Sequence, residues 1–380
     1  MNYRKLGNTG FLVSEVGIGG EYLEDESLKT TVDTMHAAMD LGVNILDIFM
    51  SEPNVRTNLG AGIKDRRDKI YVQGHICSIW ENGQYGRSRD LEKSKFFIND
   101  LFTRLDSDYI DIGMLHYVDT MDDWRDAKQN GIVDYMLKLK QQGRFRTLGV
   151  SSHDPLVAQE MVNSGVFGVL MFSINPMFDL VLNQVETIDY LEHPELGNID
   201  HISINKSRAQ LYSLCEEKGV GITVMKTLGA GRLLKAESSP FKVPMTVNQC
   251  IHYALSRPAV SSVLIGARSV SEIEDAVSYC DAADEEKDYS AVFAHLTNEQ
   301  SGACMYCNHC LPCPVHIDVA QSTRILDEAR QYGMNDSLRR EYAALGHKAS
   351  ECVACGACEK RCPFAVRVID NMKEAAALFE

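Results

Sequence analysis

Short β-type runs alternate with amphipathic helical stretches over residues 16–280. Strands that alternate with helices form parallel sheets, and eight such repeats favour a closed (β/α)₈ barrel over an open doubly wound sheet. No G-x-G-x-x-G follows the first run, which weakens the open-sheet alternative further. The predicted strands are 16–18, 43–47, 69–72, 109–115, 148–150, 169–172, 222–225 and 263–265. The predicted helices include 30–41, 91–105, 132–142, 154–164, 206–218, 246–256 and 270–280.

Polar side chains stand where several of these strands end. In a (β/α)₈ barrel the carboxyl ends of the strands surround the mouth where chemistry takes place. Two long insertions also follow strands, at 78–90 and at 176–204, and we expect them to cover the mouth. The polar residues at the predicted strand ends are Asp47, His75, His116, Ser151, Ser152, His153 and Lys226.

The overall charge excludes some classes of partner. The chain has 38 Lys and Arg against 53 Asp and Glu, a formal net charge of −15, so we expect neither a nucleic acid nor an anionic membrane as partner. No apolar run reaches the roughly 20 residues of a membrane helix, and no apolar signal core follows the first residues. We therefore expect a cytoplasmic protein.

Eight of the 12 cysteines form two tight groups after residue 300. The second group has the C-x₂-C-x₂-C-x₃-C-P spacing of a [4Fe–4S] ferredoxin, and the first is one residue shorter in its last spacing. Paired zinc knuckles are the alternative, but zinc needs only four ligands, and two runs that each end in Cys-Pro are more specific to iron–sulfur clusters. In two-cluster ferredoxins the fourth cysteine of each run binds the other cluster. The predicted ligand sets are therefore Cys304, Cys307 and Cys310 with Cys362, and Cys352, Cys355 and Cys358 with Cys313.

These patterns divide the chain into two predicted domains. A barrel occupies residues 1–288, and a small, mainly helical, ferredoxin-like domain with two [4Fe–4S] clusters occupies residues 289–380. The acidic stretch 281–288 suits a linker. Spacing alone leaves open whether the clusters carry electrons or hold the domain folded.

Several segments of the barrel resemble the aldo-keto reductase family, in its branch with a C-terminal ferredoxin-like domain. These segments are YRKLGNTG at 3–10, NILD at 44–47, LG at 59–60, DYIDIGMLH at 108–116, GVSSH at 149–153, VMKTLGAG at 224–231 and LIGAR at 264–268. The resemblance implies that NAD(P)H lies extended across the barrel mouth and gives hydride to a carbonyl. It also implies an Asp–Tyr–Lys–His tetrad that supplies the proton.

The expected tetrad is only partly present. Asp47 and His116 occupy the family's aspartate and histidine positions, whereas Glu52 stands at the tyrosine position and His75 at the lysine position. A tyrosine is a neutral acid at pH 7, whereas a glutamate acts as an acid only where its surroundings keep it protonated, and is otherwise a base. His75 can pass a proton in either direction. Two histidines and two carboxylates also resemble a metal-ligand set, which is an alternative interpretation.

The resemblance also implies a set of cofactor-binding residues. Ser151 and Ser152 stand where the family holds the nicotinamide carboxamide, Asn175 matches a sixth-strand asparagine, and Lys226 is a candidate replacement for the missing lysine. Arg268 at the start of the last helix favours NADP(H) over NAD(H). The remaining positions are Leu228, Gly229 and Gly231 around the pyrophosphate, and Gly266, Arg268 and Glu272 at the adenosine end.

The leading hypothesis is an NAD(P)(H)-linked oxidoreductase that acts on a small carbonyl or alcohol substrate. Because a nicotinamide transfers two electrons and a cubane one at a time, direct coupling needs a converter such as a flavin, for which the sequence gives no indication. A redox partner protein is a further candidate partner. Two alternatives stay open: an electron-transfer protein with a degenerate, cofactor-sensing barrel, and a metal-dependent lyase or epimerase that uses Glu52 and the histidines.

Overall fold

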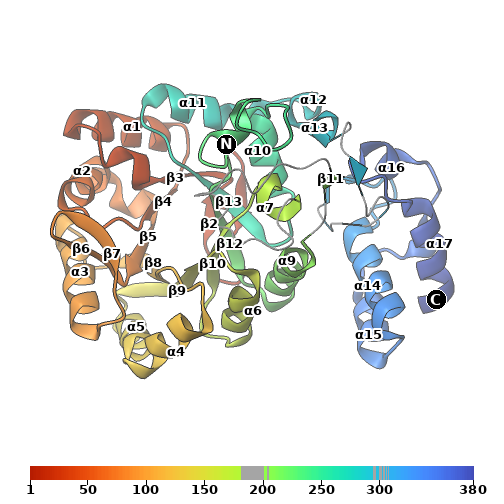
Figure 1. Cartoon of the computed structure of the whole chain (residues 1–380), viewed down its shortest axis with the longest axis horizontal. Coiled ribbons are helices and arrows are strands. Elements are labelled where there is room, and N and C mark those ends of the chain that lie inside the picture. The colour runs from red at the N-terminus through yellow and green to blue at the C-terminus, as the bar shows by residue number, and fades with distance from the viewer. Residues whose placement is uncertain are drawn as a thin grey trace.

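The computed structural model describes residues 1–180, 201–202, 205–293, 297–298, 302, 304, 306 and 308–380. Eight parallel strands form a closed barrel in chain order, and the pairing of β13 with β3 closes it (Figure 1). The predicted fold class is confirmed. The barrel strands are β3 (Val16–Gly19), β4 (Ile45–Ile48), β5 (Tyr71–Ile76), β8 (Ile110–Leu115), β9 (Phe145–Ser152), β10 (Val169–Ser173), β12 (Gly221–Met225) and β13 (Val260–Ile265).

Helices surround the barrel and bury their apolar faces against it. Many of them begin at a side chain that accepts a hydrogen bond from an otherwise unpaired backbone N–H of the first turn. These N-caps are Ser27, Asp90, Thr120, Asp154, Asn205, Thr246 and Ser269. The helices are α1 (Leu28–Asp40), α2 (Pro53–Ile63), α3 (Leu91–Arg104), α4 (Met121–Gln129), α5 (Ile132–Gln141), α6 (Pro155–Asn163), α7 (Pro176–Leu180), α9 (Lys206–Lys218), α10 (Val247–Leu255) and α11 (Val270–Ser278).

A short hairpin of β1 (Tyr3–Lys5) and β2 (Leu12–Ser14) packs at the amino-terminal end of the barrel. Its apolar side chains join the residues inside the barrel in one buried cluster. The cluster consists of Leu6, Phe11, Val13, Ile45, Ile112, Met114, Val169, Met171 and Leu264. Because this end is plugged, the mouth at the carboxyl ends of the strands is the accessible end.

The first predicted mouth insertion forms a second hairpin, of β6 (Ser78–Glu81) and β7 (Gln84–Arg87). Asn82 and Gly83 form its two-residue turn with φ of 55° and 74°, as a type I′ turn requires. Side chains alternate between the faces of a strand, and the register therefore places four of them on one face of this hairpin. They are Ser78 opposite Arg87 and Trp80 opposite Tyr85. Most of the second predicted insertion, 176–204, lies outside the described residues.

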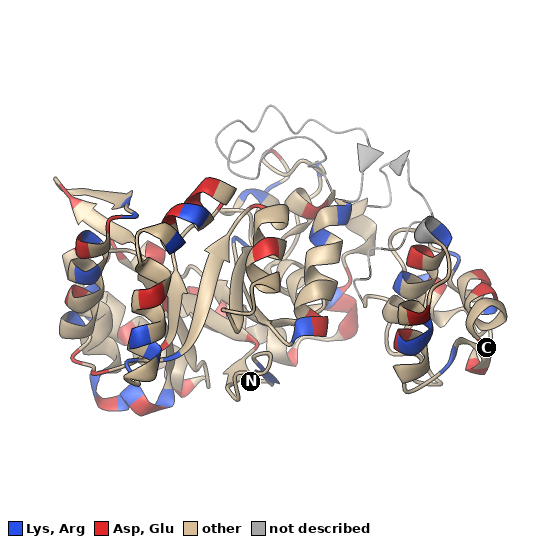
Figure 2. Cartoon of the chain, turned by 90° about the horizontal axis from the view of Figure 1, so that it is seen from below, with Lys and Arg blue, Asp and Glu red and all other residues tan. Residues whose placement is uncertain are grey.

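The C-terminal region is helical and lies beside the barrel (Figures 1 and 2). Nε2 of Gln321 donates to a carboxylate oxygen of Glu216 at 2.6 Å, and the ring of His309 meets that of His252 edge-on, with 5.8 Å between centroids. Two short helices, α12 (Asp284–Lys287) and α13 (Ser290–Phe293), occupy the predicted boundary. The C-terminal helices are α14 (Val319–Tyr332), α15 (Asp336–Ala344), α16 (Ala357–Arg361) and α17 (Val368–Phe379).

The remaining elements are small. Two-residue strands β11 (His201–Ile202) and β14 (Thr297–Asn298) pair in parallel. The 3₁₀ helices are η1 (Gly20–Leu23), η2 (Lys64–Lys69), η4 (Arg232–Leu234), η5 (Tyr279–Asp281) and η6 (Ala349–Glu351). Across the described residues, no helix has the length and apolar character needed to span a membrane.

Candidate active site and cysteine centre

Asp47, His75 and His116 meet at the barrel mouth. They stand at the ends of β4, β5 and β8, which are neighbours in the barrel, and all three side chains are buried. Nε2 of His75 lies 2.8 Å from Oδ1 of Asp47, and Nδ1 of His75 lies 2.9 Å from Nδ1 of His116. Nε2 of Gln73 also donates to Oδ1 of Asp47 at 3.0 Å. These three of the four predicted tetrad residues are thus linked by hydrogen bonds.

Tyr85 extends this cluster, although it was not among the predicted site residues. Its hydroxyl oxygen lies 2.5 Å from Nε2 of His116. Asp47, His75, His116 and Tyr85 therefore form a continuous run of hydrogen bonds, which we call the tyrosine–histidine chain. The sequence signal for Tyr85 is the Asn82–Gly83 pair, because such a turn between β-type residues predicts a hairpin and places aromatic residues on one face.

The hairpin that carries Tyr85 is tied to the barrel at several points. Arg89, just after the hairpin, donates to the backbone oxygens of His116 at 2.9 Å and of Tyr117 at 2.6 Å. The guanidinium of Arg87 lies over the ring of Tyr117, 3.7 Å from its centroid. These contacts fix the base of the hairpin against the end of β8, and therefore fix Tyr85 against His116.

Phe49 packs against the middle of the tyrosine–histidine chain. Its ring is nearly parallel to that of His116, with 5.6 Å between centroids and 7° between planes. It meets the ring of Tyr85 edge-on at 5.8 Å and that of His75 at 6.2 Å. This aromatic contact shields the hydrogen bonds of the chain from water, which strengthens them.

Burial determines which protons this cluster holds. Burial, followed by the nearby charges of His75 and Arg89, holds the pKa of His116 well below its usual range. Burial also raises the pKa of Tyr85 to about 12. His116 is therefore neutral and Tyr85 protonated near pH 7. The hydrogen-bond network then assigns one direction, in which Tyr85 donates to His116, His116 to His75, and His75 to Asp47.

The structure does not bring Glu52 into this cluster. Glu52 is the N-cap of α2, and its Oε2 accepts a hydrogen bond from the backbone N–H of Val55 at 2.6 Å. Pro53 at the first helical position fixes this start. The structure therefore joins Asp47, His75 and His116 of the expected group by hydrogen bonds, whereas the described contact of the Glu52 carboxylate is at the start of α2.

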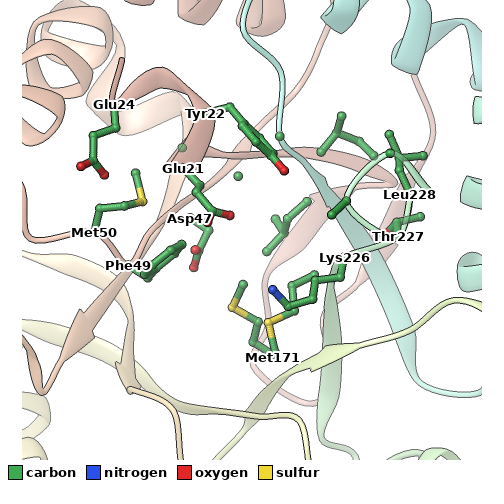
Figure 3. A pocket seen from close by; sticks show the side chains of 18 of the residues that line it. Glu21, Tyr22, Glu24, Asp47, Phe49, Met50, Met171, Lys226, Thr227 and Leu228 are labelled. Atoms are coloured by element: carbon green, nitrogen blue, oxygen red, sulfur yellow. The ribbon is translucent and has the colours of Figure 1, made fainter. Parts of the chain in front are cut away.

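A cavity of about 900 Å³ occupies the mouth and extends from the tyrosine–histidine chain to the loops after β12 and β13. Figure 3 shows Asp47 and Phe49 on one side of it and Lys226, Thr227 and Leu228 on the other. The predicted cofactor-binding residues that line it are Ser151, Lys226, Leu228, Gly231, Gly266, Arg268 and Glu272.

Three predicted cofactor-binding residues, Ser152, Asn175 and Gly229, are not among the lining residues. The Ser152 hydroxyl donates to Oδ1 of Asp119 at 3.2 Å. Nδ2 of Asn175 donates to the backbone oxygen of Lys226 at 2.7 Å and so supports Lys226 in its left-handed backbone conformation, with φ of 60°. Asn175 is therefore a support for the loop, not part of the cavity wall.

Tyr22, Gly266 and Arg268 form the far end of the cavity. A Cβ atom on Gly266 would lie 2.2 Å from the ring of Tyr22, so only glycine permits this packing. The Arg268 guanidinium lies over the same ring at 4.9 Å, and the Arg268 backbone N–H donates to Glu272 at 2.7 Å. Asp275 also lines this end. One cation thus stands among carboxylates here.

Four of the predicted cluster cysteines line one cavity in the C-terminal region: Cys313, Cys352, Cys355 and Cys358. This combines the fourth cysteine of the first group with the first three of the second. Thiols are the ligands that iron–sulfur clusters use, so this donor set fits a [4Fe–4S] cluster. In the first group Cys310 is buried, and its backbone oxygen accepts from Arg361 at 2.6 Å. Cys307 lies outside the described residues.

Single-ion sites are absent from the part of the chain that the structure describes. No three His, Cys, Asp or Glu side chains there are grouped closely enough to hold one metal ion. A cubane spreads its thiolate ligands around a larger unit than one ion does, so this result does not bear on the cysteine cavity. Asp47, Glu52, His75 and His116, all of them described, therefore do not form such a group.

Comparison with known proteins identifies both regions. The model of the Aldo/keto reductase family matches residues 15–249, which is more than half of the chain. The chain belongs to the aldo/keto reductase family. A model of a 4Fe-4S dicluster domain matches residues 303–367, so the resemblance inferred from sequence, including its C-terminal branch, is confirmed. This aldo/keto reductase is an oxidoreductase with an iron–sulfur domain.

Relatives agree with this assignment. The oxidoreductase YqkF of Bacillus subtilis (strain 168) is 28% identical over 294 residues, covering 74% of this chain and 92% of its own. L-galactose dehydrogenase of Arabidopsis thaliana is 28% identical over 313 residues, covering 72% and 86%. The holo form of aldo-keto reductase AKR11C1 from Bacillus halodurans superposes with a TM-score of 0.60 at 22% identity, covering 79% and 99%, and shows a shared fold.

Proposed function

We propose that this aldo/keto reductase transfers hydride between NAD(P)(H) and a small carbonyl or alcohol at the barrel mouth. The observation that carries the proposal is the single cavity that joins Asp47 and His116 at one end to Gly266 and Arg268 at the other. An extended dinucleotide needs such a space, with polar groups for proton transfer at one end and a cation for phosphate at the other.

The loop after β12 suits the pyrophosphate. Gly231 adopts φ of 82°, and a Cβ atom there would meet nothing within 4 Å, so the backbone is open to a ligand. Leu228 and Lys226 line the same wall, and Ser151 stands nearer the tyrosine–histidine chain. When bound, the dihydronicotinamide would supply hydride, and these residues would orient it. Arg268 would bind a 2′-phosphate, which favours NADP(H).

The substrate end of the cavity favours a small molecule. The aromatic side chains of Phe49, Trp80 and Tyr85 line this end, and the rings of Phe49 and Tyr85 pack against that of His116. Such walls contact carbon skeletons, while the tyrosine–histidine chain offers a polar end to one oxygen. The relative named L-galactose dehydrogenase supports an alcohol or its carbonyl counterpart as substrate.

We further propose two [4Fe–4S] clusters, with the crossed ligand sets predicted from the sequence. The shared cavity of Cys313 with Cys352, Cys355 and Cys358 supports one set. Cys304, Cys307, Cys310 and Cys362 would hold the other cluster. Cys355 and Val353 are exposed, which suits electron exchange with a redox partner protein. The described contacts between the C-terminal region and the barrel include those of Glu216 and His252, neither of which lines the mouth cavity.

An anaerobic titration tests the proposed function. NADPH is added to the protein with its clusters in place, and nicotinamide absorbance and the visible iron–sulfur band are followed with and without 4-nitrobenzaldehyde as a probe carbonyl. We expect NADPH to bind, to be oxidised only when the aldehyde is present, and to leave the iron–sulfur band unchanged. Bleaching of the band by NADPH alone would instead show electron transfer from nicotinamide to the clusters. Binding without oxidation by any aldehyde would favour a cofactor-sensing barrel.

A further inference from the structure

The tyrosine–histidine chain connects a buried carboxylate to the mouth cavity through three consecutive hydrogen bonds. They run from Oδ1 of Asp47 to Nε2 of His75 at 2.8 Å, between the Nδ1 atoms of His75 and His116 at 2.9 Å, and from Nε2 of His116 to the hydroxyl of Tyr85 at 2.5 Å. Asp47, His75 and His116 are buried, whereas Tyr85 is 42% exposed and lines the cavity. All four side chains line the cavity, and Tyr85 is the member of the tyrosine–histidine chain with the most surface open to a ligand.

We propose that Tyr85 is the catalytic acid and base of this enzyme, exchanging a proton with the substrate oxygen, and that His116, His75 and Asp47 position it and supply that proton. The inference rests on the proposed function, since it requires hydride transfer at the same mouth. The family's tyrosine position is occupied by Glu52, which has no hydroxyl, and Tyr85 of the β6–β7 hairpin would supply that group instead. The phenol thus reaches the mouth from a different segment of the polypeptide.

The tyrosine–histidine chain has two protonation states, one for each direction of the reaction. With both histidines neutral, each ring has one N–H, and the Tyr85 hydroxyl donates inward to Nε2 of His116. One added proton makes His75 an imidazolium next to the Asp47 carboxylate. His75 then donates from both ring nitrogens, His116 donates from Nε2 to the Tyr85 oxygen, and the Tyr85 hydroxyl is left to donate outward.

Carbonyl reduction uses the state with the added proton. The carbonyl carbon receives hydride from the bound dihydronicotinamide, the C=O double bond becomes a single bond, and its oxygen takes the Tyr85 proton. Tyr85 recovers a proton from Nε2 of His116, and Nδ1 of His116 recovers one from Nδ1 of His75. The products are the alcohol and the oxidised nicotinamide. The tyrosine–histidine chain is left with one proton fewer, and solvent restores that proton. Alcohol oxidation is the reverse.

The other polar groups near Tyr85 are less suited to this role. Oε2 of Glu52 is occupied by the backbone N–H of Val55 at the start of α2. Lys226 lies on the opposite wall of the cavity from Asp47, on the loop assigned to the dinucleotide (Figure 3). Tyr85 lines the cavity, lies 2.5 Å from Nε2 of His116, and is far more exposed than the buried His75, which also lines the cavity and contacts His116.

Charged groups from several elements set the protonation of the chain. Arg89 follows the hairpin and bonds the end of β8, and Arg87 lies on the hairpin itself. Glu21 comes from η1 and His153 from the loop after β9, and both line the cavity. Reduction uses the state with the added proton, and oxidation uses the state without it. We therefore expect the reduction rate to fall and the oxidation rate to rise with increasing pH.

The test compares Tyr85→Phe with Tyr135→Phe, which removes a hydroxyl from the partly buried Tyr135 of the outer helix α5. Single-turnover oxidation of bound NADPH by 4-nitrobenzaldehyde is measured on the protein with its clusters in place, together with the Kd for NADPH. General acid catalysis typically contributes 10²–10⁴-fold, so Tyr85→Phe should lower the rate at least a hundredfold. The Kd should change less than threefold, and Tyr135→Phe should match the unsubstituted enzyme.

Positioning by the histidines has its own readout. His75→Gln should shift or remove the pH dependence of the remaining rate, whereas a merely structural role would lower the rate equally at every pH. An unchanged rate in Tyr85→Phe, with the unsubstituted enzyme active, would overturn the assignment of Tyr85 and leave the proposed function intact. An inactive unsubstituted enzyme that still binds NADPH would overturn the proposed function itself, and the inference with it.

Discussion

Oε2 of Glu52 accepts the backbone N–H of Val55 at 2.6 Å, so the residue at the family's tyrosine position begins α2. Replacing a side chain that caps a helix with alanine typically costs about 1 kcal/mol of stability. We therefore expect Glu52→Ala to lower the free energy of unfolding by about that amount, and Glu52→Gln, which keeps an acceptor oxygen, to lower it less.

Turnover separates this structural role from a catalytic one. Both Glu52 variants should retain turnover within about threefold, because neither removes the proton of Tyr85. Urea denaturation followed by circular dichroism gives the stability, and aldehyde-dependent NADPH oxidation gives the rate. A hundredfold loss of rate in Glu52→Gln, the size typical of a lost proton-transfer group, would return Glu52 to the catalytic centre.

His252 makes stability depend on pH. Burial, followed by the nearby charges of His309 and Lys287, lowers the pKa of His252 to about 4. In the unfolded chain the pKa of a histidine is about 6.5. Between pH 4 and pH 6.5 the unfolded chain therefore binds a proton at His252 that the folded chain does not. This contribution is complete above pH 6.5 and decreases as the pH falls. We expect the free energy of unfolding to fall by about 1 kcal/mol between pH 6.5 and pH 5.5.

The measurement is anaerobic urea denaturation at pH 7.5, 6.5 and 5.5 on the unsubstituted protein and on His252→Gln. The variant loses the contact of Nδ1 with the hydroxyl of Tyr279 at every pH, but its stability should fall less between pH 6.5 and 5.5. Parallel pH profiles for the two proteins would show that His252 is protonated equally well in both states.

Local patterns were enough to predict the barrel and the cysteine groups. Strand β8 has six buried residues in succession, as expected of a strand buried on both faces, and its periodicity is visible without knowledge of its neighbours. The spacing of Cys352, Cys355 and Cys358 is likewise a local property, because three cysteines with the spacing typical of cluster ligands lie within seven residues.

The parts that could not be predicted depend on contacts between distant segments. The contact of Tyr85 with His116 joins residues 31 apart in sequence, and only the docking of the hairpin brings them together. Asn175 was expected to bind the cofactor, yet its amide donates to the backbone oxygen of Lys226, 51 residues away in sequence. The Glu52 cap is different, because it is local: Pro53 and Val55 follow Glu52 directly, and the family pattern implied another role for this carboxylate.

Arg268 should discriminate between the two dinucleotides. It is a cavity-lining cation at the start of α11, where the 2′-phosphate of NADPH would lie. A charge-assisted hydrogen bond typically contributes about 1.5–3 kcal/mol, so Arg268→Gln should weaken NADPH binding roughly tenfold or more. NADH binding should change less than threefold. Nicotinamide fluorescence measures both, with the exposed Glu274→Gln on the same helix as control. Equal losses for both dinucleotides would show that Arg268 acts through the packing of Tyr22.

Cys313 offers a test of the crossed cluster ligands, because it shares a cavity with Cys352, Cys355 and Cys358. Cys313→Ala should lose roughly half of the bound iron, and Cys280→Ser, outside both groups, should lose none. Alkylation with iodoacetamide followed by peptide mapping then shows which thiols became reactive. Crossed ligation predicts that those of the second group, residues 352–358, react in Cys313→Ala. Alkylation of the first group, residues 304–310, would instead mean that each group holds its own cluster.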